Sequence, residues 1–143
     1  MLMLVGQYHI KIDKRRRFRI PSVFFKEING EPLIIEKNLY HPCLDISTLT
    51  AFENKMDSLL SKINEYDKKQ IQILEIIYSN AFPVEANKQI IHLPLDFFEY
   101  LQLKKESDLV IFGMGNSLRI IAKSRNEAKQ MDKNEFLKML KDR

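Results

Sequence analysis

The sequence predicts an α+β fold in which two similar halves flank a pair of helices and a further helix follows at the C-terminal end. Three observations support this prediction. Short apolar strands, a proline and a pair of phenylalanines occur twice in the same order. The segment between the two copies has apolar residues at helical spacing, and so does the segment from residue 124 onward.

The first copy starts with a strand over residues 8–12, where apolar and polar residues alternate before a charged turn. After the turn, Phe18-Arg19-Ile20 predicts a short strand that ends at Pro21. A proline suits the first turn of a helix, and we expect Phe24-Phe25 to lie in that helix. Two more apolar segments predict strands, residues 33–35 and residues 44–46.

The second copy has the same five elements in the same order, and its turn is one residue shorter. Five matched elements are difficult to attribute to chance, so we interpret the chain as an internal repeat. The matching segments are residues 84–86, residues 91–93 with Pro94, the helix with Phe97-Phe98, residues 109–111 and residues 118–120.

Between the copies, two capping patterns predict two helices. Thr50 with Glu53 has the spacing of a capping box, and Asp67 with Gln70 forms a similar pair at the start of the second helix. Residues 64–66 form the bend, and a connection this short predicts a helical hairpin. We interpret the apolar stripes of both helices as part of the core. Their members are Phe52, Met56, Leu59, Leu60, Ile63, Ile71, Leu74, Ile77 and Tyr78.

The C-terminal segment predicts another helix. Ser124 with Glu127, and Asp132 with Glu135, have the form of N-terminal caps. Such a helix could lie on a membrane surface, but its narrow apolar face and mixed charges favour packing on its own subunit or on a neighbouring one. The apolar face consists of Phe136, Leu137 and Leu140.

Composition excludes several classes of protein. With 45% hydrophobic and 29% charged residues, the chain of 143 residues is globular rather than disordered. No apolar run approaches the ~18 residues of a membrane span, and the first residues lack the basic start of a signal peptide. A single cysteine excludes an internal disulfide and fits the reducing cytoplasm. Four glycines leave no glycine-rich loop for phosphate.

The positive charge is concentrated in one turn. Residues 1–26 contain seven basic side chains and one acidic side chain, although the whole chain has a net charge of only +4. Most of these cations lie in Asp13-Lys14-Arg15-Arg16-Arg17, between two predicted strands. A solvated basic turn without a ligand would have the same composition, but charge gathered on one hairpin is typical of proteins that bind the phosphate backbone of nucleic acid.

The residue types of this turn suggest a division of roles. An arginine fork fits phosphate oxygens and also the O6 and N7 edge of guanine, and a two-stranded ribbon can enter the major groove. We expect Lys14 and Arg16 to contact phosphate, and Arg15 and Arg17 to be candidate base readers. Asp13 is expected to orient the turn, by accepting backbone N–H groups or by pairing with Arg17. Lys11 and Arg19 complete the predicted DNA-binding set.

These residues carry a resemblance to a known family. Residues 6–13, followed by Arg17-Phe18-Arg19-Ile20-Pro21, resemble the opening of MraZ proteins, in which an alternating strand leads through Asp-x-Lys-Gly-Arg to a strand ending in proline. Residues 39–46 are similar to the family's segment before its first linker helix. The second half resembles the second copy of the same unit, so the likeness extends from residue 5 to about residue 122.

The resemblance implies both a fold and a function. The fold would be two SpoVT-AbrB-like units, residues 5–48 and 80–123, which exchange hairpins to form a pseudo-dimer with a barrel-like core inside one chain. Linker helices would occupy residues 49–79, and a C-terminal helix residues 124–143. The function would be sequence-specific transcriptional regulation in the cytoplasm at the nucleoid. Ring-shaped homo-oligomers would bind repeated promoter elements of the division and cell-wall gene cluster.

The chain departs from the family pattern at both turns. Arg15 replaces a lysine, and Arg16 replaces a glycine, so the first turn has either altered geometry or a strained arginine. In the second turn Asn87, Lys88 and Gln89 are the polar residues and no arginine follows, which predicts weak DNA binding there or none. These departures motivate an alternative, a ring-forming scaffold or nucleoid-associated protein that has lost sequence-specific reading.

Other combinations of chemical side chains do not form a convincing site. His41, Cys43 and Asp45 alternate along a predicted strand, but no glycine turn near them could form an oxyanion hole. His9 and His92 have no second ligand at metal spacing. We therefore predict that the chain is not an enzyme and has no cofactor, metal or small-molecule substrate. The predicted partners are double-stranded DNA and further copies of the chain, without a membrane.

Overall fold

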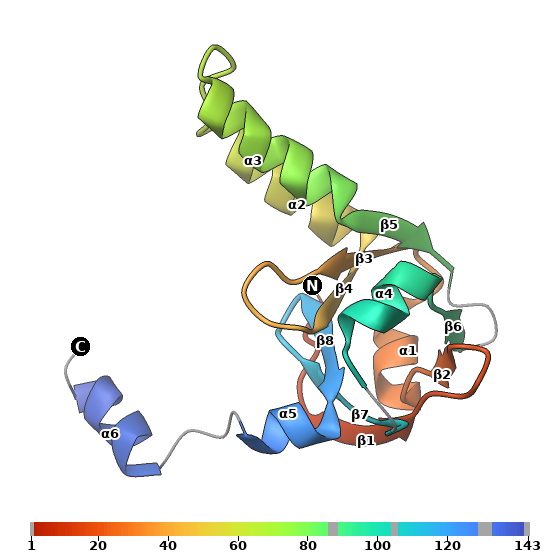
Figure 1. Cartoon of the computed structure of the whole chain (residues 1–143). Coiled ribbons are helices and arrows are strands. Elements are labelled where there is room, and N and C mark those ends of the chain that lie inside the picture. The colour runs from red at the N-terminus through yellow and green to blue at the C-terminus, as the bar shows by residue number, and fades with distance from the viewer. Residues whose placement is uncertain (1, 86–88, 104–105, 129–132, 142–143) are drawn as a thin grey trace.

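The computed structural model describes residues 2–85, 89–103, 106–128 and 133–141 (Figure 1). Its strands are β1 (Gln7–Lys11), β2 (Arg17–Arg19), β3 (Leu33–Lys37), β4 (Leu44–Thr48), β5 (Ala81–Val84), β6 (Ile90–His92), β7 (Asp108–Gly113) and β8 (Ser117–Ala122). Its helices are α1 (Ser22–Ile28), α2 (Leu49–Leu60), α3 (Lys68–Ser79), α4 (Leu95–Tyr100), α5 (Lys123–Ala128) and α6 (Lys133–Lys141). The mixture of helices with an antiparallel sheet confirms the predicted fold class at this level.

The strands form one large sheet and one ribbon. Six strands pair in the order β1-β7-β8-β4-β3-β5, and β2 pairs with β6 in a separate two-stranded ribbon. All of these pairs are antiparallel. Four of them join one half of the chain to the other, namely β1 with β7, β5 with β3, β4 with β8 and β2 with β6. The two halves are therefore held together by main-chain hydrogen bonds as well as by side-chain packing.

The six-stranded sheet is open, so the predicted barrel-like core is wrong in this respect. Strands β1 and β5 form its two edges. Each edge packs an aromatic ring on the helix that follows it in the chain, because Tyr8 lies 5.4 Å from Phe24 and Phe82 lies 6.1 Å from Phe97, measured between ring centroids. After each edge strand the chain turns away into the β2–β6 ribbon. The edges thus meet helices instead of each other, which prevents closure.

The main core lies between the sheet, the ribbon and helices α1 and α4 (Figure 1). The alternation of the strands decides which side chains enter it, because successive residues of a strand point to opposite faces. Phe18 of β2 and Ile91 of β6 are buried opposite each other, while Arg17 and Arg19 on either side of Phe18 are exposed. From the helices, the core receives Phe24, Ile28, Phe97 and Leu101.

A cross-strand ion pair joins β4 to β8. Asp45 and Arg119 lie directly opposite each other, and Nε of Arg119 donates to Oδ1 of Asp45 at 2.7 Å. Both side chains are only 21% exposed. The hydrogen bond to Asp45 raises the pKa of Arg119 above its ordinary value, so the guanidinium stays charged. Burial of this pair at the middle of the sheet is therefore electrically balanced.

The connection from β7 to β8 requires a glycine. The backbone of Leu4 passes so close to Gly113 that a Cβ on this residue would lie 2.1 Å from the carbonyl oxygen of Leu4, which is a steric clash. Leu4 N and Gly115 N exchange hydrogen bonds with each other's carbonyl groups at 2.7 and 2.9 Å. The segment is thus a strand connection that holds the N-terminal residues.

Helices α2 and α3 form a hairpin that projects from the body of the protein (Figure 1). Asp67 caps α3 as predicted, because its side chain accepts from the backbone N–H groups of Lys69 and Gln70. The predicted cap of α2 is wrong by two residues. The hydroxyl of Thr48 accepts from Ala51 N at 3.1 Å. Thr48 is the last residue of β4, so its hydroxyl lies next to the first backbone N–H groups of α2 that have no partner within the helix.

The expectation that both apolar stripes of the hairpin belong to the core is also wrong in part. Phe52 and Met56 of α2 are buried, but α3 has no buried residue. Tyr78 of the predicted stripe is about half exposed, and Ile71, Leu74 and Ile77 are only partly buried. Since the hairpin extends beyond the sheet, only its base reaches the body, and much of α3 faces outward.

In the C-terminal segment the structure describes two helical stretches, α5 and α6, and residues 129–132 between them lie outside the described residues. Ser124 does not cap α5, because its hydroxyl donates to Glu106 at 2.8 Å. Asp132 lies outside the described residues. Helix α6 exposes about half of each apolar side chain of the predicted face, Phe136, Leu137 and Leu140. In the described part of the chain, no helix combines the length and the apolar character needed to cross a bilayer.

The cap of α2 generates a stability prediction. Thr48→Val keeps the shape of the side chain but removes the capping hydroxyl, so we expect it to lower the free energy of unfolding by about 1 kcal/mol. Thr50→Val is the matched control, since the Thr50 hydroxyl bonds Glu31 at an exposed site. Urea denaturation of both variants would measure the difference. Equal losses would contradict the assignment of Thr48 as the cap.

Candidate nucleic-acid interface

The basic turn between β1 and β2 is organised around one carboxylate. Oδ1 of Asp13 accepts from the backbone N–H groups of Arg15 at 2.9 Å and Arg17 at 2.8 Å. The backbone N–H of Asp13 donates to Arg17 O at 2.9 Å, and that of Arg16 donates to Asp13 O at 3.0 Å. A short side chain that bonds its own turn in this way restricts the loop to one shape.

Asp13 also pairs with an arginine side chain. Nε of Arg17 donates to Oδ2 of Asp13 at 2.9 Å, and each of the two side chains is a little under half exposed. The pKa of Asp13 lies below its ordinary value, first because of the backbone N–H of Arg17 and then because of the Arg17 side chain and the backbone N–H of Arg15. The carboxylate is therefore charged at neutral pH and holds the Arg17 guanidinium beside the turn.

Arg16 occupies the left-handed region of the backbone, with φ of 63°. Only glycine adopts this conformation without a penalty, and a side chain there costs roughly 1 to 2 kcal/mol. The sequence predicted either an altered turn or a strained arginine at this position, and the structure has the strained arginine. Its Nε donates to Leu93 O at 3.1 Å, and its carbonyl accepts from Leu93 N at 2.8 Å. Arg16 thus contacts the second half of the chain directly.

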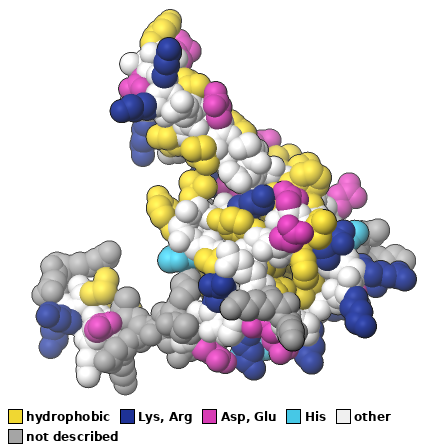
Figure 2. Space-filling model, viewed as in Figure 1, with side chains coloured by type: hydrophobic (Ala, Val, Ile, Leu, Met, Phe, Trp, Pro, Cys, Tyr) yellow, Lys and Arg dark blue, Asp and Glu magenta, His cyan; other side chains and the backbone are white. Residues whose placement is uncertain are grey.

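The structure places the predicted cations on one side of the protein. Figure 2 shows lysine and arginine side chains gathered at the right of the view, over the turn between β1 and β2. Arg16 is half-buried, whereas the other members of the predicted set are exposed. These exposed members are Lys11, Lys14, Arg15, Arg17 and Arg19.

A shallow groove of about 380 Å³ lies beside the turn, between β1 and the start of α1. Lys11 and Arg19 line it together with His9, Ser22 and Gln89. His9 and Ser22 were missed by the sequence reasoning as members of this surface. The alternation of β1 could have indicated His9, because it lies two residues before Lys11 and so shares its face.

The second turn is described only at its end. Asn87 and Lys88, two residues of the predicted weak second site, lie outside the described residues. Gln89, the third, has φ of 72°. Its side-chain Nε2 donates to Ile20 O at 2.6 Å and to Ser22 Oγ at 3.0 Å. The amide of Gln89 is therefore directed at the first half of the chain.

The other sequence candidates are separated by the fold. Cys43 is fully buried against Val110 and Ile121, while Asp45 pairs with Arg119. His41 and Cys43 both lie in the loop before β4, which begins at Leu44, so the three side chains do not share one strand face as expected. Within the described ranges, no three His, Cys, Asp or Glu side chains gather in a way that could hold a metal ion.

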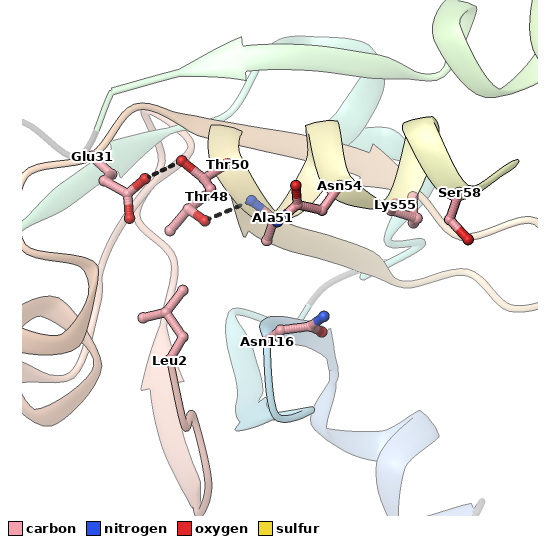
Figure 3. A pocket seen from close by; sticks show the side chains of 9 residues that line it. All are labelled: Leu2, Glu31, Thr48, Thr50, Ala51, Asn54, Lys55, Ser58 and Asn116. Atoms are coloured by element: carbon pink, nitrogen blue, oxygen red, sulfur yellow. Dashed lines mark hydrogen bonds between the residues drawn. The ribbon is translucent and has the colours of Figure 1, made fainter. Parts of the chain in front are cut away.

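A larger hollow of about 710 Å³ lies beside α2, away from the basic turn (Figure 3). Hydroxyl and amide groups of Thr50, Asn54, Ser58 and Asn116 line it, with one acid and one base. The base, Lys55, pairs with Glu36 at 2.7 Å. Charge is thus compensated here, whereas the cations of the basic turn outnumber its single carboxylate.

Comparison with known proteins identifies relatives over nearly the whole chain. A protein of Mycoplasma mycoides subsp. mycoides SC named transcriptional regulator MraZ is 30% identical, over 96% of this chain and 98% of its own length. The proteins of the same name from Acetivibrio thermocellus and Bacteroides thetaiotaomicron are 31% and 25% identical, over 92% and 95% of this chain and 90% and 88% of their own lengths. No family model matches the chain.

The geometry of Asp13 predicts how the turn responds to acid. A carboxyl whose pKa is lowered by folding stabilises the folded turn above its ordinary pKa of 3.8, and this contribution is lost as the pH falls through the lower folded value. We therefore expect the turn to be unchanged between pH 5 and 8 and to loosen only below about pH 4. An NMR titration following the Arg15 and Arg17 amides would test this, with Asp13→Asn as the control that does not titrate. Loosening that begins near pH 6 would contradict the assignment.

Proposed function

Because this chain belongs to the MraZ family of transcriptional regulators, we propose that it regulates transcription by binding duplex DNA through the basic turn between β1 and β2. The observation that carries the proposal is the exposed set of cations on a turn whose shape Asp13 restricts. A preorganised turn loses little conformational entropy on binding, so more of the contact energy remains as affinity.

We assign the cations of the turn to two kinds of contact. Lys14 and Arg16 meet phosphate and set the position of the turn on the duplex, while Arg15 and Arg17 are the candidate base readers in the major groove. Lys11 and Arg19 extend the phosphate contacts along the groove beside β1. The second turn contributes weakly or not at all, because the Gln89 amide already bonds Ile20 and Ser22.

We further propose that residues 5–48 and 80–123 are two SpoVT-AbrB-like units that form a pseudo-dimer within the chain, with linker helices at 49–79 and a C-terminal helix at 124–143. Reciprocal contacts support this proposal. Arg16 bonds Leu93 through its carbonyl and its side chain, and Gln89, at the same place in the second copy, bonds Ile20 in the same two ways. Exchanged strands, as in β1 with β7 and β5 with β3, are what such a pseudo-dimer requires.

The proposed assembly is a ring of identical subunits. Two exposed apolar patches support it: Met3, Val5 and Met114 beside the β7–β8 connection, and Leu39 with Tyr40 in the loop before β4. The two patches lie at opposite ends of β4, since Ser47 pairs with Ser117 and Leu44 pairs with Ile120. Contact between two different patches is head-to-tail, and such contacts close into rings when the rotation permits. Helix α6, with its exposed apolar face, is proposed to dock on a neighbouring subunit.

The targets that we propose are repeated promoter elements upstream of division and cell-wall genes, bound in the cytoplasm at the nucleoid. A single turn binds weakly at physiological salt, whereas a ring presents many turns at high effective concentration. The strained Arg16 and the absence of arginine from the second turn favour the alternative, a scaffold or nucleoid-associated protein without sequence reading. Competition by random duplex separates the two functions, because only a sequence reader resists it.

Removing the proposed base reader provides a direct test. Arg17→Ala should weaken binding to the chain's own upstream DNA by about 1–3 kcal/mol if Arg17 reads a base. Lys62→Ala is the matched control, because it removes one positive charge from an exposed position at the end of α2. Fluorescence anisotropy at constant salt would measure both. Equal losses in the two variants would remove Arg17 from the interface.

The ring predicts how affinity depends on repeats. Duplexes with one, two and four copies of the upstream element should bind with rising affinity, about 10² to 10⁴-fold overall, because linked sites gain effective concentration. Titration of the three duplexes, together with a native mass of the assembly, would measure this. A monomeric mass with equal affinity for the three duplexes would exclude the ring.

A further inference from the structure

One residue of each turn forms two hydrogen bonds with a residue in the other half of the chain, Arg16 with Leu93 and Gln89 with Ile20, and we call this arrangement the clasp. In the second turn, Gln89 O accepts from Ile20 N at 2.8 Å, and its Nε2 donates back to Ile20 O at 2.6 Å. Arg16 makes the equivalent two bonds with Leu93, at 2.8 and 3.1 Å. Both residues that clasp are in the left-handed region, with φ of 63° for Arg16 and 72° for Gln89.

The backbone polar groups of Ile20 and Leu93 depend on these bonds for their hydrogen-bond partners. Ile20 and Leu93 are fully buried, so their backbone N–H and C=O groups are out of reach of bulk water. Each is followed by a proline, Pro21 or Pro94, which ends the strand and cannot donate a hydrogen bond. A buried carbonyl without a partner destabilises the fold, so the side chain of Gln89 supplies a donor that the ribbon itself lacks.

The clasp also reaches the predicted DNA surface. Ile20 follows Arg19 directly, and the second bond of the Gln89 amide, to Ser22 Oγ at 3.0 Å, extends to the start of α1. Gln89 therefore holds both ends of the short segment that leaves β2. Arg17 and Arg19 are on that strand and share its outer face.

We propose that Gln89 is a positioning residue for the DNA-binding surface of the first half. In this proposal the second turn serves chiefly to fix the segment of the first half that leaves β2. This inference rests on the proposed function, since it concerns the placement of Arg17 and Arg19 against DNA. For this role the second turn needs only the side-chain donor of Gln89, a residue in the left-handed region.

The test uses the full chain with substitutions at position 89. Gln89→Met keeps the length of the side chain and also places a non-glycine residue in the left-handed region, but it removes the side-chain donor. The Ile20 N–H keeps its backbone acceptor, Gln89 O, but loss of the side-chain bond beside it makes local opening easier. We therefore expect hydrogen exchange of the Ile20 amide to rise about tenfold while that of Leu93 stays unchanged. The reciprocal variant, Arg16→Met, should accelerate exchange at Leu93 and leave Ile20 unchanged. Affinity of Gln89→Met for the upstream duplex should fall about three- to tenfold with an unchanged salt slope, because no phosphate contact is lost.

Rescue separates positioning from a direct contact with DNA. Gln89→Arg introduces a donor like that of Arg16, so we expect it to restore both the slow exchange of Ile20 and the affinity. A salt slope steeper by about one, without restored exchange, would instead mean that position 89 touches phosphate and would overturn the proposal. Unchanged exchange at Ile20 in Gln89→Met would also overturn it.

The two proposals fail in different ways. If the parent chain ignores duplex DNA even in dilute buffer, the proposed function is wrong, and the positioning role of Gln89 is wrong with it. If the parent binds and Gln89→Met binds equally well despite faster exchange at Ile20, only the positioning role is wrong. A circular dichroism melt of each variant confirms that the fold is retained before binding is compared.

Discussion

The pairing of β2 with β6 is the contact on which the basic turn depends. Phe18 and Ile91 meet at its centre and are buried, so the register of this short ribbon is set by core packing. Because neighbouring residues of a strand face opposite ways, burial of Phe18 directs Arg17 and Arg19 outward. A slip of one residue would bury two guanidinium groups and expose an aromatic ring, which makes the observed register strongly preferred. The charge of the turn thus reaches the surface because the hydrophobic effect acts on its neighbours.

Joining two similar halves in one chain lets them differ where a symmetric dimer could not. Asp45 and Arg119 occupy the same place in the two copies and lie opposite each other in β4 and β8. In a dimer of identical chains, two copies of one residue would meet here, and like charges directly opposite each other destabilise a sheet. The single chain has a carboxylate against a guanidinium instead. The same freedom allows a basic turn in the first half and a turn that donates a neutral amide in the second.

The surfaces proposed for DNA and for neighbouring subunits lie apart. The basic turn is at the right of the body in Figure 1, and the α2–α3 hairpin projects away at the upper left. Leu39 and Tyr40, one of the two apolar patches proposed for contacts between subunits, lie in the loop before β4 at the base of this hairpin. Binding of DNA at the basic turn would therefore leave this patch uncovered, as a ring that reads several elements at once requires.

The amino-acid sequence was enough to predict most helices and strands of this protein, because the signals for them are local. Alternation and helical spacing identified the paired strands and helices of both copies, and the Asp67 cap followed from a pattern of four residues. Which strands pair depended on the folding of the whole chain, because β1 joins β7 across about a hundred residues and alternation carries no partner information. The same reason explains the misplaced α2 cap, the outward face of α3 and the clasp of Gln89 on Ile20. Each depends on where a distant segment ends or packs, and no local period records that position.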